Sequence, residues 1–272
     1  MQTPINLRQL YTPIQPTVRQ TAGQQVSYRE FLPCAELQPF VYCYWRLHTV
    51  QPLAEPFYYR VVADGCIDVF FELSSTHENF VMGFCKKYTE FPLANDFDYV
   101  GIRFLPTVFP QIFKVNAADI SDRFEALNAV APELAQFIAE NFHSELSEQK
   151  ICGIFDAYLT QRIARTDLDF DGRLYEALGV ILQKQGMLNV ETDLKTGFSP
   201  RQLRRVFEFY IGDTAKTFSK VVRFQQILRA KPSVQSLRQN KLFFDAGYYD
   251  QAHFIKEFKN FYGVTPSKAF GR

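Results

Sequence analysis

The sequence lacks any run of about eighteen apolar residues, the length needed for a membrane-spanning helix. It also lacks, near its beginning, the basic stretch followed by an apolar segment that marks a secretory signal. We therefore expect no membrane association and a cytoplasmic location. The composition, 47% apolar and 22% charged, is typical of folded globular domains rather than of disordered chains.

Motifs for catalysis and for metal binding are absent as well. The sequence has no nucleophile elbow, no phosphate-binding glycine loop and no zinc motif. Its five cysteines are odd in number and none is spaced as CxxC, a pattern typical of free thiols in a reducing compartment. The histidines at 48, 77 and 143 are scattered. We therefore expect no catalytic residues, no metal and no cofactor, and hence no enzyme.

Charge divides the 272 residues unevenly, although the net charge is only +1. Residues 171–272 contain 17 basic and 9 acidic side chains, whereas the preceding part contains 13 basic and 20 acidic ones. The length favours two domains, and this division indicates a basic module joined to an acidic one. A basic module attracts nucleic acid or an acidic protein, and charge alone leaves both alternatives open.

The two halves also differ in periodicity. Short aromatic and β-branched runs separated by turn residues extend to about residue 116 and predict a small antiparallel β-barrel, cupin-like, or a sandwich. From 117 to 165 the spacing becomes helical, with apolar stripes over 132–142 and 148–163. These helices either pack on the barrel or form a dimer seam. We predict an α+β chain with a sensor or dimerisation domain at 1–165, a linker at 166–172 and an all-α domain at 173–272.

The all-α part contains a duplicated turn–helix unit. Four pairs of matching residues are fifty-one positions apart: Leu203 and Phe254, Phe207 and Phe258, Gly212 and Gly263, Thr214 and Thr265. Gly197 and Gly247 precede the two helices, as the tight turn of a helix–turn–helix favours. Ser199 and Asp250 occupy the N-cap positions. A further helix over 214–230 joins the two units.

Polar side chains gather near the start of both expected helices. Arg201, Arg204 and Arg205 are spaced to share one face, where the planar guanidinium suits guanine and phosphate acceptors. The N-terminal part of a recognition helix is the part that reaches base edges. The candidate DNA contacts are Arg201, Gln202, Arg204 and Arg205 in the first unit, and Gln251, Ala252, His253, Ile255 and Lys256 in the second.

The β-rich part supplies a candidate effector site. Arg60 and Arg103 stand on apolar strands, where a charge either pairs with a carboxylate such as Asp64 or Asp68 or faces an anionic ligand. Aromatic residues nearby either line a pocket or fill the core. The candidate effector contacts are Trp45, Tyr58, Arg60, Asp64 and Arg103, with Tyr59 as a further aromatic.

The C-terminal hundred residues resemble the DNA-binding domain of the AraC/XylS transcription regulators. The residues that carry the resemblance are Ser199–Phe207, Arg223-Phe224, Gly247-Tyr248, Asp250–Phe254, Phe258, Gly263 and Thr265–Ser267. The N-terminal motifs Pro39–Val41, Tyr44-Trp45, Asp64–Cys66 and Gly101–Phe104 are similar to a sensor domain found in a subset of these regulators.

The resemblance implies two helix–turn–helix subdomains that read two successive segments of major groove in double-stranded DNA. It implies transcriptional control with RNA polymerase as a partner, more often by activation than by repression. It also implies a small-molecule effector or a homodimer, the latter through helices within 132–163. Phe243 and Asp193 depart from the small residue that the family has before each turn. The alternative is a non-catalytic adaptor whose basic C-terminal face binds an acidic protein.

Overall fold

The computed structural model describes residues 5–15, 25–230, 232 and 247–270. Within this part, eight strands form two antiparallel sheets. The larger sheet has the order β1-β2-β7-β4-β5-β8, and the smaller pairs β3 with β6. The strands are β1 (Val26–Phe31), β2 (Val41–Thr49), β3 (Phe57–Val61), β4 (Ile67–Glu72), β5 (Asn79–Met82), β6 (Thr89–Leu93), β7 (Asp98–Phe104) and β8 (Phe124–Ala126).

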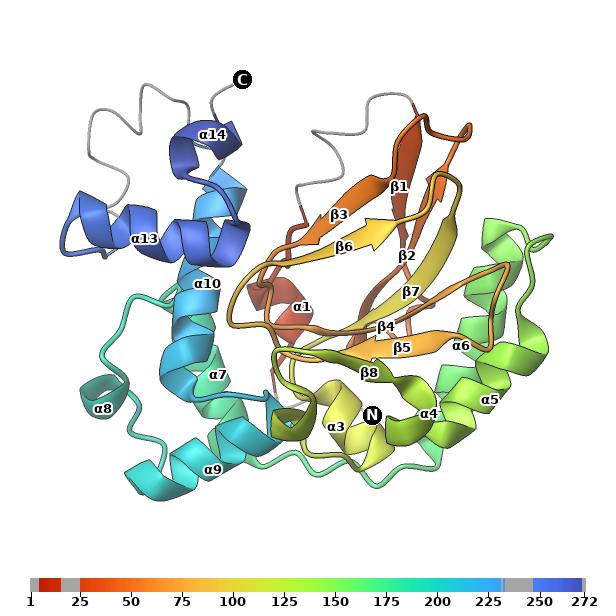
Figure 1. The fold of residues 1–272 in the computed structure, drawn as a ribbon. Helices are drawn as coiled ribbons and strands as arrows, with labels where there is room; N and C mark the ends of the chain where they lie inside the picture. The colour runs from red at the N-terminus through yellow and green to blue at the C-terminus, as the bar shows by residue number, and fades with distance from the viewer. Residues whose placement is uncertain (1–4, 16–24, 231, 233–246, 271–272) are drawn as a thin grey trace.

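The helices follow the chain around these sheets (Figure 1). Those of the N-terminal part are α1 (Leu7–Leu10), α3 (Val108–Phe113), the 3₁₀ turn η1 (Ala117–Ile120), α4 (Leu127–Val130), α5 (Pro132–Asn141) and α6 (Glu148–Ala164). Those of the C-terminal part are α7 (Gly172–Gln183), α8 (Val190–Asp193), α9 (Pro200–Tyr210), α10 (Ala215–Ala230), α13 (Gln251–Tyr262) and α14 (Pro266–Phe270). The predicted order of an antiparallel β domain, then helices, then an all-α part is confirmed.

Alternation along the strands divides the β domain into two apolar layers, because successive side chains point to opposite faces of a sheet. On β4, Val69 and Phe71 face the main core, whereas Phe70 faces the small sheet β3–β6. Phe155 of α6 packs against Phe71 and Tyr44, so the apolar stripe of this helix is buried within the chain. Of the two alternatives for the helical region, packing on the β domain is the one that the structure shows.

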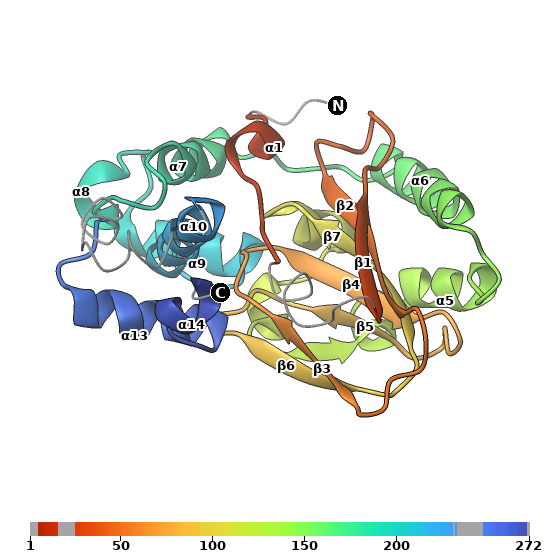
Figure 2. The same cartoon turned by 90° about the horizontal axis from the view of Figure 1, so that it is seen from above.

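The N-terminal and C-terminal parts share one continuous apolar core, and α1 and residues 11–15 run between them (Figure 2). The Tyr11 hydroxyl donates to the carbonyl of Asp64 at 2.5 Å. The Tyr175 hydroxyl of α7 hydrogen-bonds Thr107, directly before α3, at 2.9 Å and Gln111 of α3 at 3.1 Å. Of the residues predicted as a linker, 166–171 lie between α6 and α7 and Gly172 begins α7, and the parts that they connect are packed together.

Candidate nucleic-acid interface and pocket

The start of α9 is fixed by a complete capping box. Ser199 Oγ accepts from the backbone N–H of Gln202 at 3.3 Å, and Gln202 Oε1 accepts from the N–H of Ser199 at 2.9 Å. Gly197 has φ = +78°, the left-handed geometry that favours glycine, so the turn before this helix needs that residue. Leu203 and Phe207 bury the inner face. The chain therefore presents the opposite face of α9 in one defined orientation.

That outer face carries the three predicted arginines. Arg201, Arg204 and Arg205 are all exposed, and the described residues provide no ion pair to Arg201 or Arg205. Arg204 Nε donates to Glu208 at 2.7 Å, four residues further along the helix. An exposed pair of this kind contributes little free energy, so Arg204 can exchange Glu208 for a phosphate or a base at small cost. The structure thus brings these guanidinium groups together in solvent.

The second unit has the same local design. Gly247 has φ = +72°, and Asp250 caps α13 by accepting from the N–H of His253 at 2.7 Å. Phe254 and Phe258 bury the inner face of the helix. Gly263 ends α13 in the left-handed conformation.

The predicted contact residues of α13 divide into two groups. Gln251, Ala252, His253 and Lys256 are exposed. Ile255 is half-buried and packs partly against the core, so less of it is available to a groove. Tyr249 is 89% exposed directly before α13, and sequence reasoning did not single it out.

α10 joins the two units and holds α13 through a buried ion pair. Arg223 donates to Glu257 Oε1 at 2.6 Å, and its guanidinium lies 4.0 Å from the centroid of the Tyr248 ring. Burial alone would raise the pKa of Glu257, but Arg223, Tyr248 and Lys220 hold that pKa below its usual value. The carboxylate is therefore ionised at neutral pH and ties the second unit to the bridging helix.

Two further lysines lie on α10 beside the predicted contacts. Lys216 and Lys220 are four residues apart and line a surface hollow together with Asn189. Lys220 also borders a second hollow with His253 and Lys256. Sequence reasoning missed both lysines, although their spacing places them on one face of the helix.

The N-terminal domain contacts the C-terminal ends of α9 and α13, the two helices that the sequence predicts to contact DNA (the reading helices). Lys86 Nζ, in the loop between β5 and β6, lies 3.2 Å from Asp213 just beyond α9. The carbonyl of the same Lys86 accepts from Asn260 of α13 at 2.7 Å, and the N–H of Tyr88 donates to the carbonyl of Asn260 at 3.0 Å. Residues 83–88 therefore anchor the C-terminal ends of α9 and α13. The N-terminal ends, which carry the predicted contacts, are left exposed.

One of the two departures from the family pattern can be located. Asp193 ends the four-residue α8 and pairs with Lys184 at 2.9 Å on the surface, so this position does not need a small residue for core packing. Phe243 lies outside the described residues.

A pocket of about 170 Å³ lies between the two sheets. Its described walls come from β2 to β8, and their aromatic members are Trp45, Tyr59, Phe70, Phe80, Phe91, Tyr99 and Phe124. The Trp45 indole lies close against Gly101, where an added Cβ would come within 2.3 Å of the ring. Gly101 therefore makes the space that lets this tryptophan form the wall of the pocket.

Behind this wall stands a buried ion cluster. Arg103 is 1% exposed and lies 3.0 Å from Asp68 and 3.3 Å from both Asp64 and Glu30. Trp45 Nε1 donates to Asp68 at 3.1 Å, so Asp68 connects the cluster to the pocket. Burial raises the pKa of Asp68 to about 6 despite the opposing effect of Arg103.

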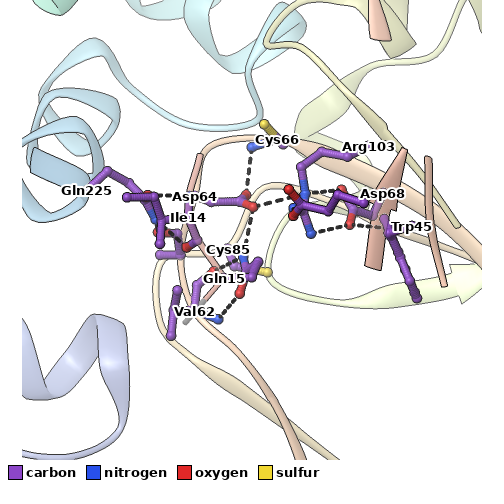
Figure 3. Close-up of polar contacts among 12 residues, drawn as sticks. Ile14, Gln15, Trp45, Val62, Asp64, Cys66, Asp68, Cys85, Arg103 and Gln225 are labelled. Carbon is purple, nitrogen blue, oxygen red and sulfur yellow. Dashed lines mark hydrogen bonds and ion pairs between the residues drawn. The ribbon is translucent and has the colours of Figure 1, made fainter. Parts of the chain in front are cut away.

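A chain of polar contacts leads from this cluster to α10 (Figure 3). Gln15 donates to Asp64 Oδ2 at 2.8 Å and accepts from the N–H of Val62. Gln225 of α10 donates to the carbonyl of Ala63 at 2.7 Å and accepts from the N–H of Ile14 at 2.8 Å. The pocket wall and α10 are thereby joined through hydrogen bonds and ion pairs.

The predicted effector contacts occupy three different surroundings. Trp45 lines the pocket, whereas Arg103 and Asp64 stand behind its wall. Tyr58 is 66% exposed and lies outside the described lining, because the neighbouring Tyr59 points inward instead. Arg60 pairs with Glu90 at 2.5 Å and stacks on Tyr88. Of the two alternatives for both arginines, the structure shows pairing with carboxylates.

Within the described ranges, no three His, Cys, Asp or Glu side chains are grouped so as to hold a metal ion. No described helix is long and apolar enough to cross a membrane.

Comparison with known proteins matches two segments of the chain. Residues 194–272 match a helix-turn-helix domain, and residues 29–125 match a domain of unknown function (DUF6597). Crystal structures of ToxT from Vibrio cholerae O395 and of an apo ToxT variant from strain SCE256 are similar, with TM-scores of 0.43 and 0.44. Their identities are 11% and 12%; the matches cover 91% and 83% of this chain and 97% of each ToxT chain. No curated protein matches the sequence. The domain match at 194–272 confirms the predicted helix-turn-helix units.

Proposed function

We propose that this chain, whose residues 194–272 form a helix-turn-helix domain of the AraC type, is a sequence-specific transcription regulator. It acts on DNA in the cytoplasm and needs no catalysis. The observation that carries the proposal is the pair of capped helices, α9 and α13, whose exposed N-terminal ends bear the basic and polar side chains. Both helices are held by the N-terminal domain at their other ends, so the faces that would meet DNA are free of that domain.

The spacing of the two helices suits successive segments of major groove. α10 has 16 residues, which at about 1.5 Å per residue makes it roughly 24 Å long. Phe207 of α9 packs against Phe218 of α10. Glu257 of α13 pairs with Lys220 and Arg223 of α10, so both helices pack within this length (Figure 1). We expect them to enter successive segments of major groove, which lie about one turn of B-DNA apart.

The two units would contribute unequally. Three cations, those of Arg201, Arg204 and Arg205, would face one segment. The Gln202 side chain accepts from the N–H of Ser199 in the capping box, so it would contact DNA only at the start of α9. The second unit offers the polar side chains of Gln251 and His253, the methyl group of Ala252, the cation of Lys256 and part of Ile255. We therefore expect the first segment to dominate the salt dependence and the second to add shape and hydrogen-bond recognition.

The proposal extends to control and partners. The pocket between the two sheets is the proposed effector site, and the polar chain through Arg103 and Gln225 is the proposed connection to α10. Activation through RNA polymerase is the proposed mode. Because the apolar stripes of α5 and α6 are buried within the chain, a homodimer through 132–163 would use their outer faces.

A second candidate function is an adaptor whose basic C-terminal part binds an acidic protein. The excess of 17 basic over 9 acidic residues in 171–272 favours either partner. The two functions can be distinguished because a DNA-binding regulator prefers one base sequence, whereas a protein that binds acidic partners would show no such preference among DNA duplexes.

The test is in vitro selection of random duplex DNA by the full chain, repeated with the double variant Arg204→Ala/Lys256→Ala. A matched control, Lys150→Ala/Arg165→Ala, removes two exposed cations from the region of α6 instead. Enrichment of two sequence blocks about ten base pairs apart, lost only in the first variant, is the expected result. Equal enrichment by both variants would refute the assigned interface. No enrichment from the parent chain at any salt concentration would favour the adaptor.

A further inference from the structure

The pocket between the two sheets has a chemical character that the proposed function does not specify. We propose that it binds an organic cation, a quaternary or protonated amine with an apolar or aromatic body. This inference names the ligand class of the proposed effector site and so rests on the proposed function for its regulatory meaning. The binding itself is independent of DNA.

Aromatic rings form most of the described wall and contact one another around it. Phe70 stacks on Phe80 at 5.7 Å between centroids and meets Phe91 edge-on at 6.1 Å. Phe124 meets Phe80 at 5.7 Å and Phe91 at 5.2 Å, which closes a ring of four phenyl groups. Aromatic faces carry negative electrostatic potential, and a set of them around a cavity is the arrangement that recognises quaternary ammonium groups.

The ion cluster behind the wall is also negative, like the electrostatic potential of the aromatic faces. Arg103 supplies one positive charge against the three carboxylates of Asp68, Asp64 and Glu30, so the cluster is negative when all are ionised. Asp68 lines the pocket itself, and no described lining residue is basic. A cation in the pocket would be attracted by this excess, whereas an anion would face Asp68 without a partner. The raised pKa of Asp68 is consistent with a carboxylate that lacks sufficient positive charge nearby.

Volume limits the size of the ligand. A cavity of about 150 Å³ lined by apolar side chains holds benzene. The volume of about 170 Å³ therefore suits one ring or a short branched chain together with a small ammonium group. A longer polyamine or a nucleotide would exceed this volume.

The chain carries its own reporter of occupancy. Its single tryptophan, Trp45, is a wall of the pocket, so tryptophan emission of the full-length protein reports directly on a ligand there. Three probes separate charge from shape: phenyltrimethylammonium, its neutral isostere tert-butylbenzene, and benzoate as an anion. We expect the cation to bind at least about tenfold more tightly than the isostere, because cation–π attraction is strongest in a desolvated site.

Variants test whether the contact is the one proposed. Phe91→Leu keeps the pocket apolar but removes one aromatic face, and Asp68→Asn removes the lining charge. Each should lower the affinity for phenyltrimethylammonium several-fold and leave that for tert-butylbenzene nearly unchanged. Phe137→Leu, a half-buried position on α5 outside the pocket, is the matched control and should alter neither. Should Asp68→Asn fold poorly, Phe91→Leu still decides the question.

Equal or tighter binding of tert-butylbenzene, tightest binding of benzoate, or no binding of the cation would each overturn the inference. The DNA selection described above fails or succeeds separately. If the protein binds the cation but selects no DNA sequence, the proposed ligand class stands and the proposed regulator is refuted. If it selects a DNA sequence but does not bind the cation, the regulator stands and the ligand class is refuted.

Discussion

Replacing Arg103 by methionine should destabilise the fold strongly, and in a pH-dependent way. The guanidinium is 1% exposed and is the cation shared by Asp68, Asp64 and Glu30 at 3.0 to 3.3 Å. Removing one partner of a buried ion pair costs about 3–5 kcal/mol, because the other charges stay buried without compensation. For a chain of this size the loss corresponds to a fall in Tm of roughly 6–20 °C.

The pH dependence follows from the carboxyl that lines the pocket. The pKa of Asp68 is raised from 3.8 to about 6 in the folded protein, so ionising it costs stability as the pH rises through that window. The cost at neutral pH is roughly 3 kcal/mol. Arg103 lowers this pKa, and without Arg103 the carboxyl would titrate at still higher pH. The deficit of Arg103→Met relative to the parent should therefore be largest near pH 8 and smaller near pH 5.5.

Thermal unfolding followed by far-UV circular dichroism at these two pH values measures the deficit. Arg46→Met is the control, because Arg46 pairs with Asp98 at 2.5 Å on the same sheet but is partly exposed, and a pair of this kind contributes only about 0–1 kcal/mol. The account of the cluster would be refuted if Arg103→Met and the parent had the same Tm at pH 8. It would also be refuted if the difference in Tm between them were no smaller at pH 5.5.

Three other substitutions have defined outcomes. Arg204→Ala should weaken binding to the selected DNA by about 1–3 kcal/mol in fluorescence anisotropy; unchanged preference at every base position would contradict base contact by this residue. Lys86→Met should speed amide hydrogen exchange around Asp213 without lowering Tm by more than a few degrees, because the substitution removes an exposed ion pair with Asp213 but keeps the Lys86 carbonyl that accepts from Asn260; faster exchange around Asn260 alone would contradict this assignment. Gly101→Ala should displace Trp45, shift its emission and cost about 1–3 kcal/mol, since the added Cβ would lie 2.3 Å from the indole; an unshifted spectrum would show that the wall can relax.

The reading helices could be predicted from sequence because their signals are local. Ser199 and Asp250 cap the N–H groups of their own helices, and Gly197 and Gly247 are needed for turns made by adjacent residues. A spacing of fifty-one residues then relates one unit to the other without any knowledge of packing. The match of residues 194–272 to a helix-turn-helix domain is the outcome expected of such signals.

The pocket was harder to predict, because its residues come from seven strands whose register the sequence does not show. Shifting the pairing by one residue turns every side chain of a strand to the other face. Tyr58 and Tyr59 illustrate the ambiguity: both are aromatic neighbours, yet Tyr59 pairs across the small sheet with Phe91 and lines the pocket, while Tyr58 faces solvent. Arg103 could be recognised as a charge on an apolar strand, but Glu30 of β1, one of its partners, stands seventy-three residues away.

The anchoring of both units by one loop also follows from tertiary structure alone. Residues 83–88 lie between β5, which contributes Phe80 and Met82 to the pocket, and β6, which contributes Phe91. A ligand that separates these strands would move the loop, and through Lys86 it would move the ends of both α9 and α13. Because both contacts are made by the single residue Lys86, through its Nζ and through its carbonyl, a displacement of the loop would shift the ends of both helices together. Under the proposed function, effector binding would then change the affinity for DNA by displacing both reading helices at once.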